Sequence, residues 1–265
     1  MNRIKISPLV AYPKTTKTLG PQPPISLSPA DKSSTSTQKK PLLDSDSVFA
    51  RRESPDSTDS SLFLPLHYEK NYEYPLLVWL HNNGDDPNQV QRVMPQLSLR
   101  NFVAVAPQAA LGDHHCGFYW DQDPSSIDYS TDAVLDAIDL AKLRTNINRR
   151  RIFVAGFGAA GTMAFRVALT HPDLFAGVAS INGPLPEGSA PLGRWSSSRN
   201  LEVFWSHCRK SEEFKQAQLC QQLKLLHVAG FSVTLRQYPG ADDLTSSALS
   251  DLNSWIMQMF SSTIA

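Results

Sequence analysis

The sequence predicts an α/β fold in which a mainly parallel sheet is flanked by helices on both faces. From residue 62 onward, short apolar runs alternate with segments of helical periodicity. The runs are apolar throughout and bounded by turn residues, which is typical of strands buried on both faces. Strands that alternate with helices lie parallel and are joined by right-handed crossovers. We therefore place one domain at residues 61–265.

Seven apolar runs define the expected strands. The first, residues 62–66, is predicted at an edge of the sheet, because Pro65 lacks the N–H that a central strand donates. The others have the continuous apolar character of buried strands and span residues 76–80, 102–107, 152–155, 176–181, 201–205 and 231–235.

Four segments between or after these runs have helical patterns. Residues 130–143 begin with Ser130 and Thr131, which are candidate N-caps, and then repeat apolar residues at helical spacing. The remaining predicted helices span residues 161–171, 212–229 and 246–260.

Residues 1–60 differ in composition from the rest of the chain. They are dense in Ser, Thr and Pro, with few apolar residues. Such a segment buries too little apolar surface to offset its ordering entropy, so we expect a disordered N-terminal tail. Docking of its Pro-rich stretch in an aromatic groove and phosphorylation of its Ser/Thr clusters remain alternatives to a solvated tail.

Composition limits the classes of partner. The 265-residue chain has 41% hydrophobic residues and a formal net charge of +0, which removes the electrostatic case for nucleic acid or anionic membranes. It has no apolar stretch of about 20 residues, so we expect no membrane span. The N-terminus lacks a signal-peptide core, and three widely spaced cysteines do not suggest a disulfide framework. We expect a cytoplasmic protein.

The most informative motif follows the predicted strand at residues 152–155. Residues 156–161 read GFGAAG, in the context of a G-x-S-x-G nucleophile elbow, where a strand turns sharply into a helix and presents a serine. Gly158 stands at the apex, and glycine has no side chain to attack a carbonyl. An elbow strains its apex residue by about 1–3 kcal/mol. Glycine reaches such backbone angles easily, so the turn can persist without the nucleophile.

Several segments occur in the order of a known family. A loop at His81–Gly84 follows an early strand, the elbow follows at residues 151–161, its helix and turn span residues 162–177, and a Tyr-Pro-Gly loop begins at Tyr238. On these segments the chain resembles α/β-hydrolases, most closely the phospholipase/carboxylesterase group of small esterases. The resemblance covers residue 62 to the C-terminus. It implies the α/β-hydrolase fold and a Ser, acid, His triad in that chain order.

Every triad position differs from the family pattern. Gly158 replaces the serine, Ser211 stands at the acid, and Asp242 stands at the histidine. Glu212 or Glu213 could supply the acid only with a shift of register. We therefore predict a pseudo-esterase that retains a pocket for an unknown small-molecule ligand or protein partner. The alternative is an atypical carboxylesterase or phospholipase-type hydrolase with displaced catalytic groups.

The resemblance also indicates the residues around the pocket. These are the oxyanion loop, the two neighbours of the apex and two aromatic residues of a covering loop: His81, Asn82, Asn83, Gly84, Phe157, Ala159, Tyr119 and Trp120. The N–H of Asn82 is expected to point inward, with its side chain in the substrate space. Alternatively, Asn82 and Asn83 cap a turn. Tyr119 and Trp120 either form an apolar wall or pack against the sheet.

Other chemical groups carry weaker signals. Cys208 is an alternative nucleophile beside His207, although neighbouring residues on a strand point to opposite faces. His114, His115 and Cys116 have no second pair at ligand spacing, so we predict no metal site and no cofactor. Carboxylates near the expected pocket mouth, at positions 85, 86, 242 and 243, would suit a cationic ligand or a divalent metal bound through oxygen, or they are ordinary solvated loop groups.

Overall fold

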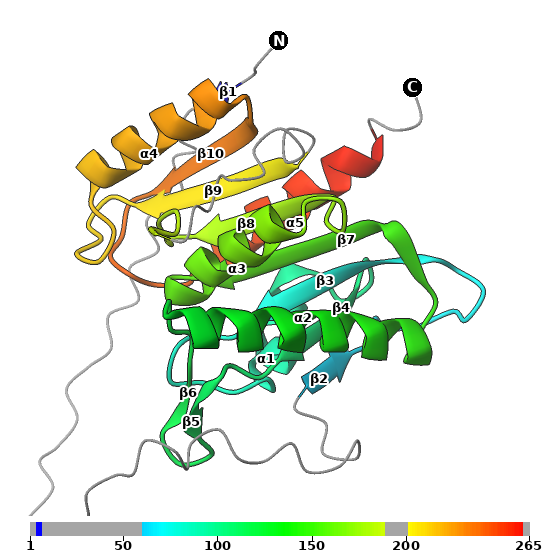
Figure 1. Ribbon diagram of the computed structural model, residues 1–265. Helices are drawn as coiled ribbons and strands as arrows, with labels where there is room; N and C mark the ends of the chain where they lie inside the picture. The colour runs from blue at the N-terminus through cyan, green and yellow to red at the C-terminus, as the bar shows by residue number, and fades with distance from the viewer. Residues whose placement is uncertain (1–3, 7–59, 189–200, 262–265) are drawn as a thin grey trace, which may run out of the picture. The chain divides into compact units, whose positions relative to one another are not determined.

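The computed structural model describes residues 4–6, 60–188 and 201–261 (Figure 1). The strands of the main sheet are β1 (Ile4–Ile6), β2 (Ser60–Phe63), β3 (Tyr74–Leu80), β4 (Val103–Pro107), β7 (Ile147–Phe157), β8 (Gly177–Ile181), β9 (Glu202–Cys208) and β10 (Ser232–Tyr238). A separate hairpin consists of β5 (Leu111–Asp113) and β6 (Gly117–Tyr119). The helices are α1 (Gln89–Leu97), α2 (Pro124–Arg144), α3 (Ala159–Thr170), α4 (Gln216–Ala229) and α5 (Ser246–Ser261).

The main sheet confirms the predicted architecture. Its strand order is β1-β10-β9-β8-β7-β3-β4-β2, and every pairing is parallel except that of β2 with β4. The first predicted strand lies at the edge as expected. It occupies Ser60–Phe63, earlier in the chain than residues 62–66, so Pro65 falls beyond its end.

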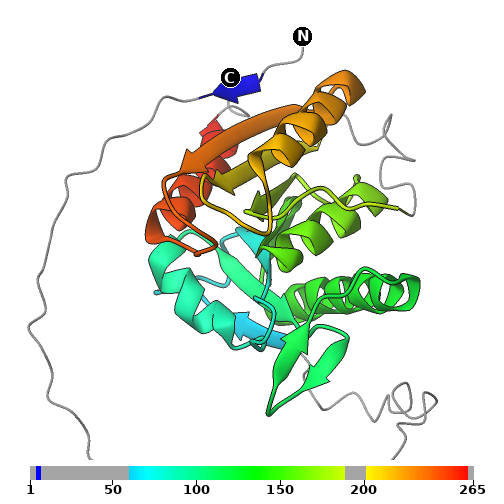
Figure 2. The same ribbon diagram turned by 90° about the vertical axis from the view of Figure 1, so that its left-hand side faces the viewer.

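Helices cover both faces of this sheet, with α2, α3 and α4 on one side and α1 and α5 on the other (Figures 1 and 2). Successive residues of β3 pack alternately into the cores on the two faces of the sheet. Leu76 and Val78 belong to the core beneath α2, α3 and α4, whereas Leu77 and Trp79 belong to the core beneath α1 and α5. This alternation explains why the strand is apolar throughout.

Two helix predictions need correction, and one further helix was not predicted. α2 begins at Pro124 rather than at residue 130, because the Asp123 carboxylate accepts hydrogen bonds from the N–H groups of Ser125 and Ser126. Ser130 and Thr131 are therefore not caps but lie inside the helix. α4 begins at Gln216 rather than at residue 212. α1 was not predicted, although its buried Val90, Val93, Met94 and Leu97 follow helical spacing.

The N-terminal segment is described only at residues 4–6 and from residue 60. Ile4–Ile6 form β1, which pairs in parallel with Val233–Leu235 of β10 and so departs from the expected disordered tail. The rest of that prediction falls on residues outside the described ones. Within the described ranges, no helix combines the length and the apolar character needed to cross a bilayer.

Replacing Leu76 with Ala tests the central core. Leu76 is 0% exposed on β3, so we expect a loss of about 2–5 kcal/mol in the free energy of unfolding, measured with urea. The matched control is L143A, because Leu143 is 84% exposed on α2 and should change stability by no more than about 0.5 kcal/mol. Similar losses in both variants would contradict the assigned packing.

Candidate active site

The elbow keeps its backbone conformation around Gly158. This residue lies between β7 and α3 with φ 57° and ψ −125°. Its N–H donates to the Ile181 carbonyl at 2.8 Å, and its own carbonyl accepts from the Thr162 N–H at 3.1 Å. A Cβ placed on Gly158 would meet no atom within 4 Å among the described residues other than its chain neighbours. The turn therefore has open space at the point where the family places its serine.

Gly156, two residues earlier, has no such space. A Cβ there would lie 2.5 Å from the Ala160 carbonyl carbon and 2.6 Å from its oxygen. These are main-chain atoms of the first turn of α3, and they cannot move without moving the helix. The close approach of α3 to β7 thus requires glycine at position 156, and it holds Gly158 in the tight turn.

The positions assigned to the acid and the histidine come together. The Ser211 hydroxyl donates to Oδ1 of Asp242, although the two residues lie on separate loops after β9 and β10. The Glu212 N–H donates to the other carboxylate oxygen of Asp242 at 3.1 Å. In a triad, the acid and the histidine would contact each other at these two positions. Here the contact joins the hydroxyl of Ser211 to the carboxylate of Asp242.

Asn182 completes this network, and the sequence analysis missed it. Its Nδ2 donates to Asp242 Oδ1 at 2.5 Å and to Ser211 Oγ at 3.3 Å, while its Oδ1 accepts from the Cys208 N–H at 2.9 Å. Asn182 is buried after β8 with φ 56°. The available signal was the Asn182-Gly183 pair, since Asn tolerates this left-handed conformation at a turn.

The network determines the charge of Asp242. Burial alone would raise the pKa of this carboxyl group, but hydrogen bonds from Ser211, the Glu212 N–H and Asn182 outweigh burial and lower the pKa below its ordinary value. Asp242 is therefore a hydrogen-bonded carboxylate at neutral pH, and its acceptor sites face protein donors.

His81 opens the oxyanion loop as a structural residue. Its Nε2 accepts from the Ala109 N–H at 3.2 Å, so the proton resides on Nδ1, which donates to the Asn82 carbonyl at 2.8 Å. Burial lowers the pKa of His81, which keeps the ring neutral. Both ring nitrogens are thus occupied within the fold.

Asn82 does not present its N–H as expected. That group donates to Oε1 of Gln89 in α1 at 3.1 Å, and the same oxygen accepts from Trp79 Nε1 at 2.8 Å. The Asp85 N–H donates to the Asn82 carbonyl at 3.1 Å, and Trp120 N–H donates to Asn83 Oδ1 at 2.9 Å. These bonds favour the alternative in which the two asparagines shape a turn.

The remaining predicted pocket residues lie in different environments. Trp120 is buried against His81, with ring centroids 5.1 Å apart, and its Nε1 donates to the His81 carbonyl at 2.7 Å. Tyr119 is exposed at the end of β6, beside Gly84. Phe157 and Ala159 are half-buried on either side of the apex. Trp120 therefore supports the oxyanion loop, whereas Tyr119 faces solvent.

Cys208 and His207 do not form a nucleophile–base pair. Cys208 packs in the core beneath α1 and α5, where burial raises the pKa of its thiol. His207 Nε2 donates to the Phe214 carbonyl at 2.9 Å in the other layer. In the part of the chain that the structure describes, no three His, Cys, Asp or Glu side chains are grouped to hold a metal ion.

Comparison with known proteins shows the family of this chain. Residues 68–259 match the phospholipase/carboxylesterase family. The chain belongs to this family. A putative esterase, NocK, of Nocardia uniformis subsp. tsuyamanensis is 30% identical over 122 residues, which cover 44% of this chain and 35% of that protein. A probable carboxylesterase of Oryza sativa subsp. japonica is 31% identical over 139 residues, which cover 51% of each protein.

Among solved structures, Arabidopsis thaliana SOBER1 has a TM-score of 0.61 and 20% identity, covering 70% of this chain and 98% of that one. At this identity the likeness shows the fold, which is the α/β-hydrolase fold. The chain spans about one third and one half of the lengths of the two curated relatives. The family and these relatives are esterases by description.

Two alanine substitutions test the elbow. We expect G156A to lower the free energy of unfolding by about 3 kcal/mol or more, because the new methyl group collides with main-chain atoms of α3. G158A should cost only about 1–2 kcal/mol, since it adds backbone strain in open space. Urea denaturation measures both values. A larger loss for G158A would contradict the open space at the apex.

D242N tests the network after β9 and β10. Asn cannot accept the Glu212 N–H with its amide nitrogen, so we expect a loss of about 2 kcal/mol in unfolding free energy at pH 7. Because the pKa of Asp242 is lowered from 3.8, its contribution is complete above that pH and is lost as the pH falls further. The difference between wild type and D242N should therefore shrink below pH 3.8. D243N, at the exposed neighbour, is the matched control and should be nearly neutral.

Proposed function

We propose that this protein is a catalytically inactive member of the phospholipase/carboxylesterase family that binds a small-molecule ligand or a protein partner through the retained scaffold. The observation that carries the proposal is the state of the three triad positions. Gly158 offers no nucleophile, and Ser211 and Asp242 are hydrogen-bonded to each other and to Asn182. A scaffold with these three residues lacks the groups of the family reaction.

The lack of a base also supports inactivity. None of the seven histidines stands in the loop after β10, where the family places its base. The two buried ones, His81 and His207, each bond main-chain groups through the ring. Asp242 is a weak base near pH 7, because its pKa is lowered, so it is poorly matched to proton abstraction from Ser211.

The space at the apex supports ligand or partner binding. In the described part of the chain, no atom beyond the two chain neighbours lies within 4 Å of the position that a Gly158 Cβ would take. α3 begins at Ala159, so the first N–H groups of the helix have no acceptor inside it and are donors for a ligand oxygen. We also propose a cytoplasmic location, since all three cysteines are free thiols, as is usual in a reducing compartment.

Rebuilding the triad tests the proposal. Hydrolysis of p-nitrophenyl acetate is measured for wild type, G158S and G158S/S211D/D242H. We expect the wild type to match the buffer rate. The triple variant should exceed G158S by about 100-fold or more, because a positioned general base contributes ~10²–10⁴-fold. Circular dichroism and thermal melting establish that each variant is folded.

If the wild type hydrolyses the ester faster than buffer does, and G158A keeps that rate, the proposed inactivity is overturned. Such a result would favour displaced catalytic groups. C208A then tests the alternative nucleophile. Labelling with a serine-reactive fluorophosphonate gives an independent readout, since the wild type should remain unlabelled. Labelling of the wild type would reveal an activated serine outside position 158.

A further inference from the structure

A second site lies at the start of β7, where this strand departs from regular pairing with β3. Tyr74 pairs with Ile147, but Leu76 pairs with Ile152, so Pro75 alone faces the four residues 148–151. Proline has no N–H to donate to a neighbouring strand, and the longer segment bulges away from it. The bulge displaces Asn148, Arg149 and Arg150 from the sheet.

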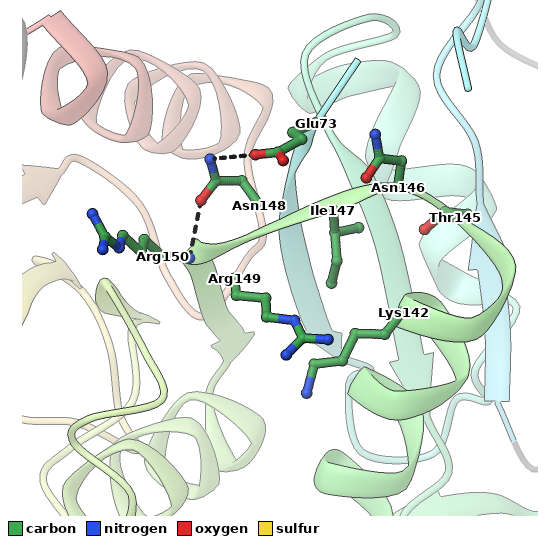
Figure 3. A pocket seen from close by; sticks show the side chains of 8 residues that line it. All are labelled: Glu73, Lys142, Thr145, Asn146, Ile147, Asn148, Arg149 and Arg150. Carbon is green, nitrogen blue, oxygen red and sulfur yellow. Dashed lines mark hydrogen bonds between the residues drawn. The ribbon is translucent and has the colours of Figure 1, made fainter. Parts of the chain in front are cut away.

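Hydrogen bonds fix the shape of this bulge. Asn148 Oδ1 accepts from the Arg150 N–H at 3.0 Å, and its Nδ2 donates to Glu73 Oε2 at 3.1 Å (Figure 3). The Tyr74 N–H donates to the Asn146 carbonyl at 3.0 Å. The segment is therefore held in place on both sides, which is a requirement for a preformed site.

The bulge and the end of α2 enclose a pocket of about 520 Å³. Such a volume falls within the roughly 300–1,000 Å³ of small-molecule sites. Lys142, Arg149 and Arg150 bring three cations to the lining, and Glu73 brings the one carboxylate, so the lining has a net charge of +2. Lys142 and Arg149 extend toward one another (Figure 3).

The charges of the two arginines are not neutralised locally. Lys142 pairs with Asp139 at 2.9 Å, whereas Arg149 and Arg150 form no ion pair with a described carboxylate. Residues 142–151 carry five basic side chains and no acidic one, in a chain whose net charge is +0. Attraction to the C-terminus of α2 accounts for Lys142 and Arg144 in its last turn. It does not account for the arginines on β7.

We propose that this pocket binds a small organic phosphate. A phosphate monoester carries a charge of about −1.5 to −2 at pH 7, and Arg149 and Arg150, which have no ion-pair partner among the described carboxylates, supply charge of the opposite sign. The Arg149 guanidinium and the Lys142 ammonium would hold its oxygens, as a planar fork and a point charge do in other phosphate sites. Asn146 adds a side-chain amide to the lining for the hydroxyls of the organic part, whereas Asn148 and Thr145 are bonded to Glu73, the Arg150 N–H and the Ala141 carbonyl.

This site is separate from the elbow. Arg150 lies in the first part of β7, and Gly158 directly follows its last residue, Phe157. At ~3.3 Å per residue they are roughly 25 Å apart. The organic-phosphate site therefore does not rest on the proposed inactivity, and G158S should bind the phosphate as the wild type does.

Calorimetric titration with glucose 6-phosphate at low ionic strength tests the proposal, with glucose as the uncharged control. We expect saturable one-site binding of the phosphate ester only. R149Q should weaken it by about tenfold, the loss of one charge-assisted hydrogen bond. The matched control is R144Q, which removes an exposed charge of the same stretch outside the pocket lining and should change affinity by no more than about twofold.

A second arm distinguishes the source of the phosphate. Phosphatidylcholine vesicles with and without phosphatidylinositol 4-phosphate are sedimented with wild type and R149Q. If the protein sediments with the vesicles only when they contain the phosphorylated lipid, and R149Q does not, the same site binds a lipid headgroup. Absence of binding in both arms would overturn the proposal. Equal losses in R149Q and R144Q would also overturn it, because they indicate general charge attraction.

Discussion

The close approach of α3 to β7 is the constraint on which the candidate active site depends. The main chain of Ala160 lies where a side chain on Gly156 would be, so strand and helix pack without any intervening atoms. This contact forces the chain to reverse at Gly158 and directs the apex into open space. The turn is thus a consequence of packing between two elements, and it persists whether or not its apex carries a nucleophile.

The network around Asn182 joins the loops after β9 and β10, in which the family resemblance places the acid and the histidine. In a working triad, an acid and a histidine hold the loops after two neighbouring strands together. Here Ser211, Asp242 and Asn182 perform that structural task through neutral and charge-assisted hydrogen bonds. A carboxylate saturated by protein donors stabilises the loops, but it has little capacity to accept a proton. Structural support and catalysis are therefore separable at these positions.

The polar groups of the loop at His81–Gly84 also form hydrogen bonds within the fold. Gln89 of α1 takes up the Asn82 N–H and the Trp79 indole, and its Nε2 donates to Asp85, which is paired with Arg92 at 2.6 Å. Trp120 and Ala109 in turn bind His81. The Asn82 N–H and both ring nitrogens of His81 are thus hydrogen-bonded within the fold, and the loop is anchored from both sides.

The sequence by itself determined the alternation of strands and helices, the edge position of the first strand, the elbow turn and the absence of a serine at its apex. These features depend on local patterns, namely continuous apolar runs, small residues and the identity of the residue at one position. The family resemblance also predicts that Ser211 and Asp242 stand at the acid and histidine positions, and this assignment stays a prediction.

Only the tertiary structure decided which of these residues meet. The contact of Ser211 with Asp242 joins loops 31 residues apart, and Asn182 reaches Asp242 across 60 residues. Likewise, Pro75 faces the bulge of β7 only because β3 and β7 are neighbours in the sheet. Local periodicity carries no information about such partners, because hydrogen bonding between distant residues depends on how the strands are ordered. The helix start at Pro124 was missed for a different reason, since an Asp123 cap and a following proline are visible in the sequence.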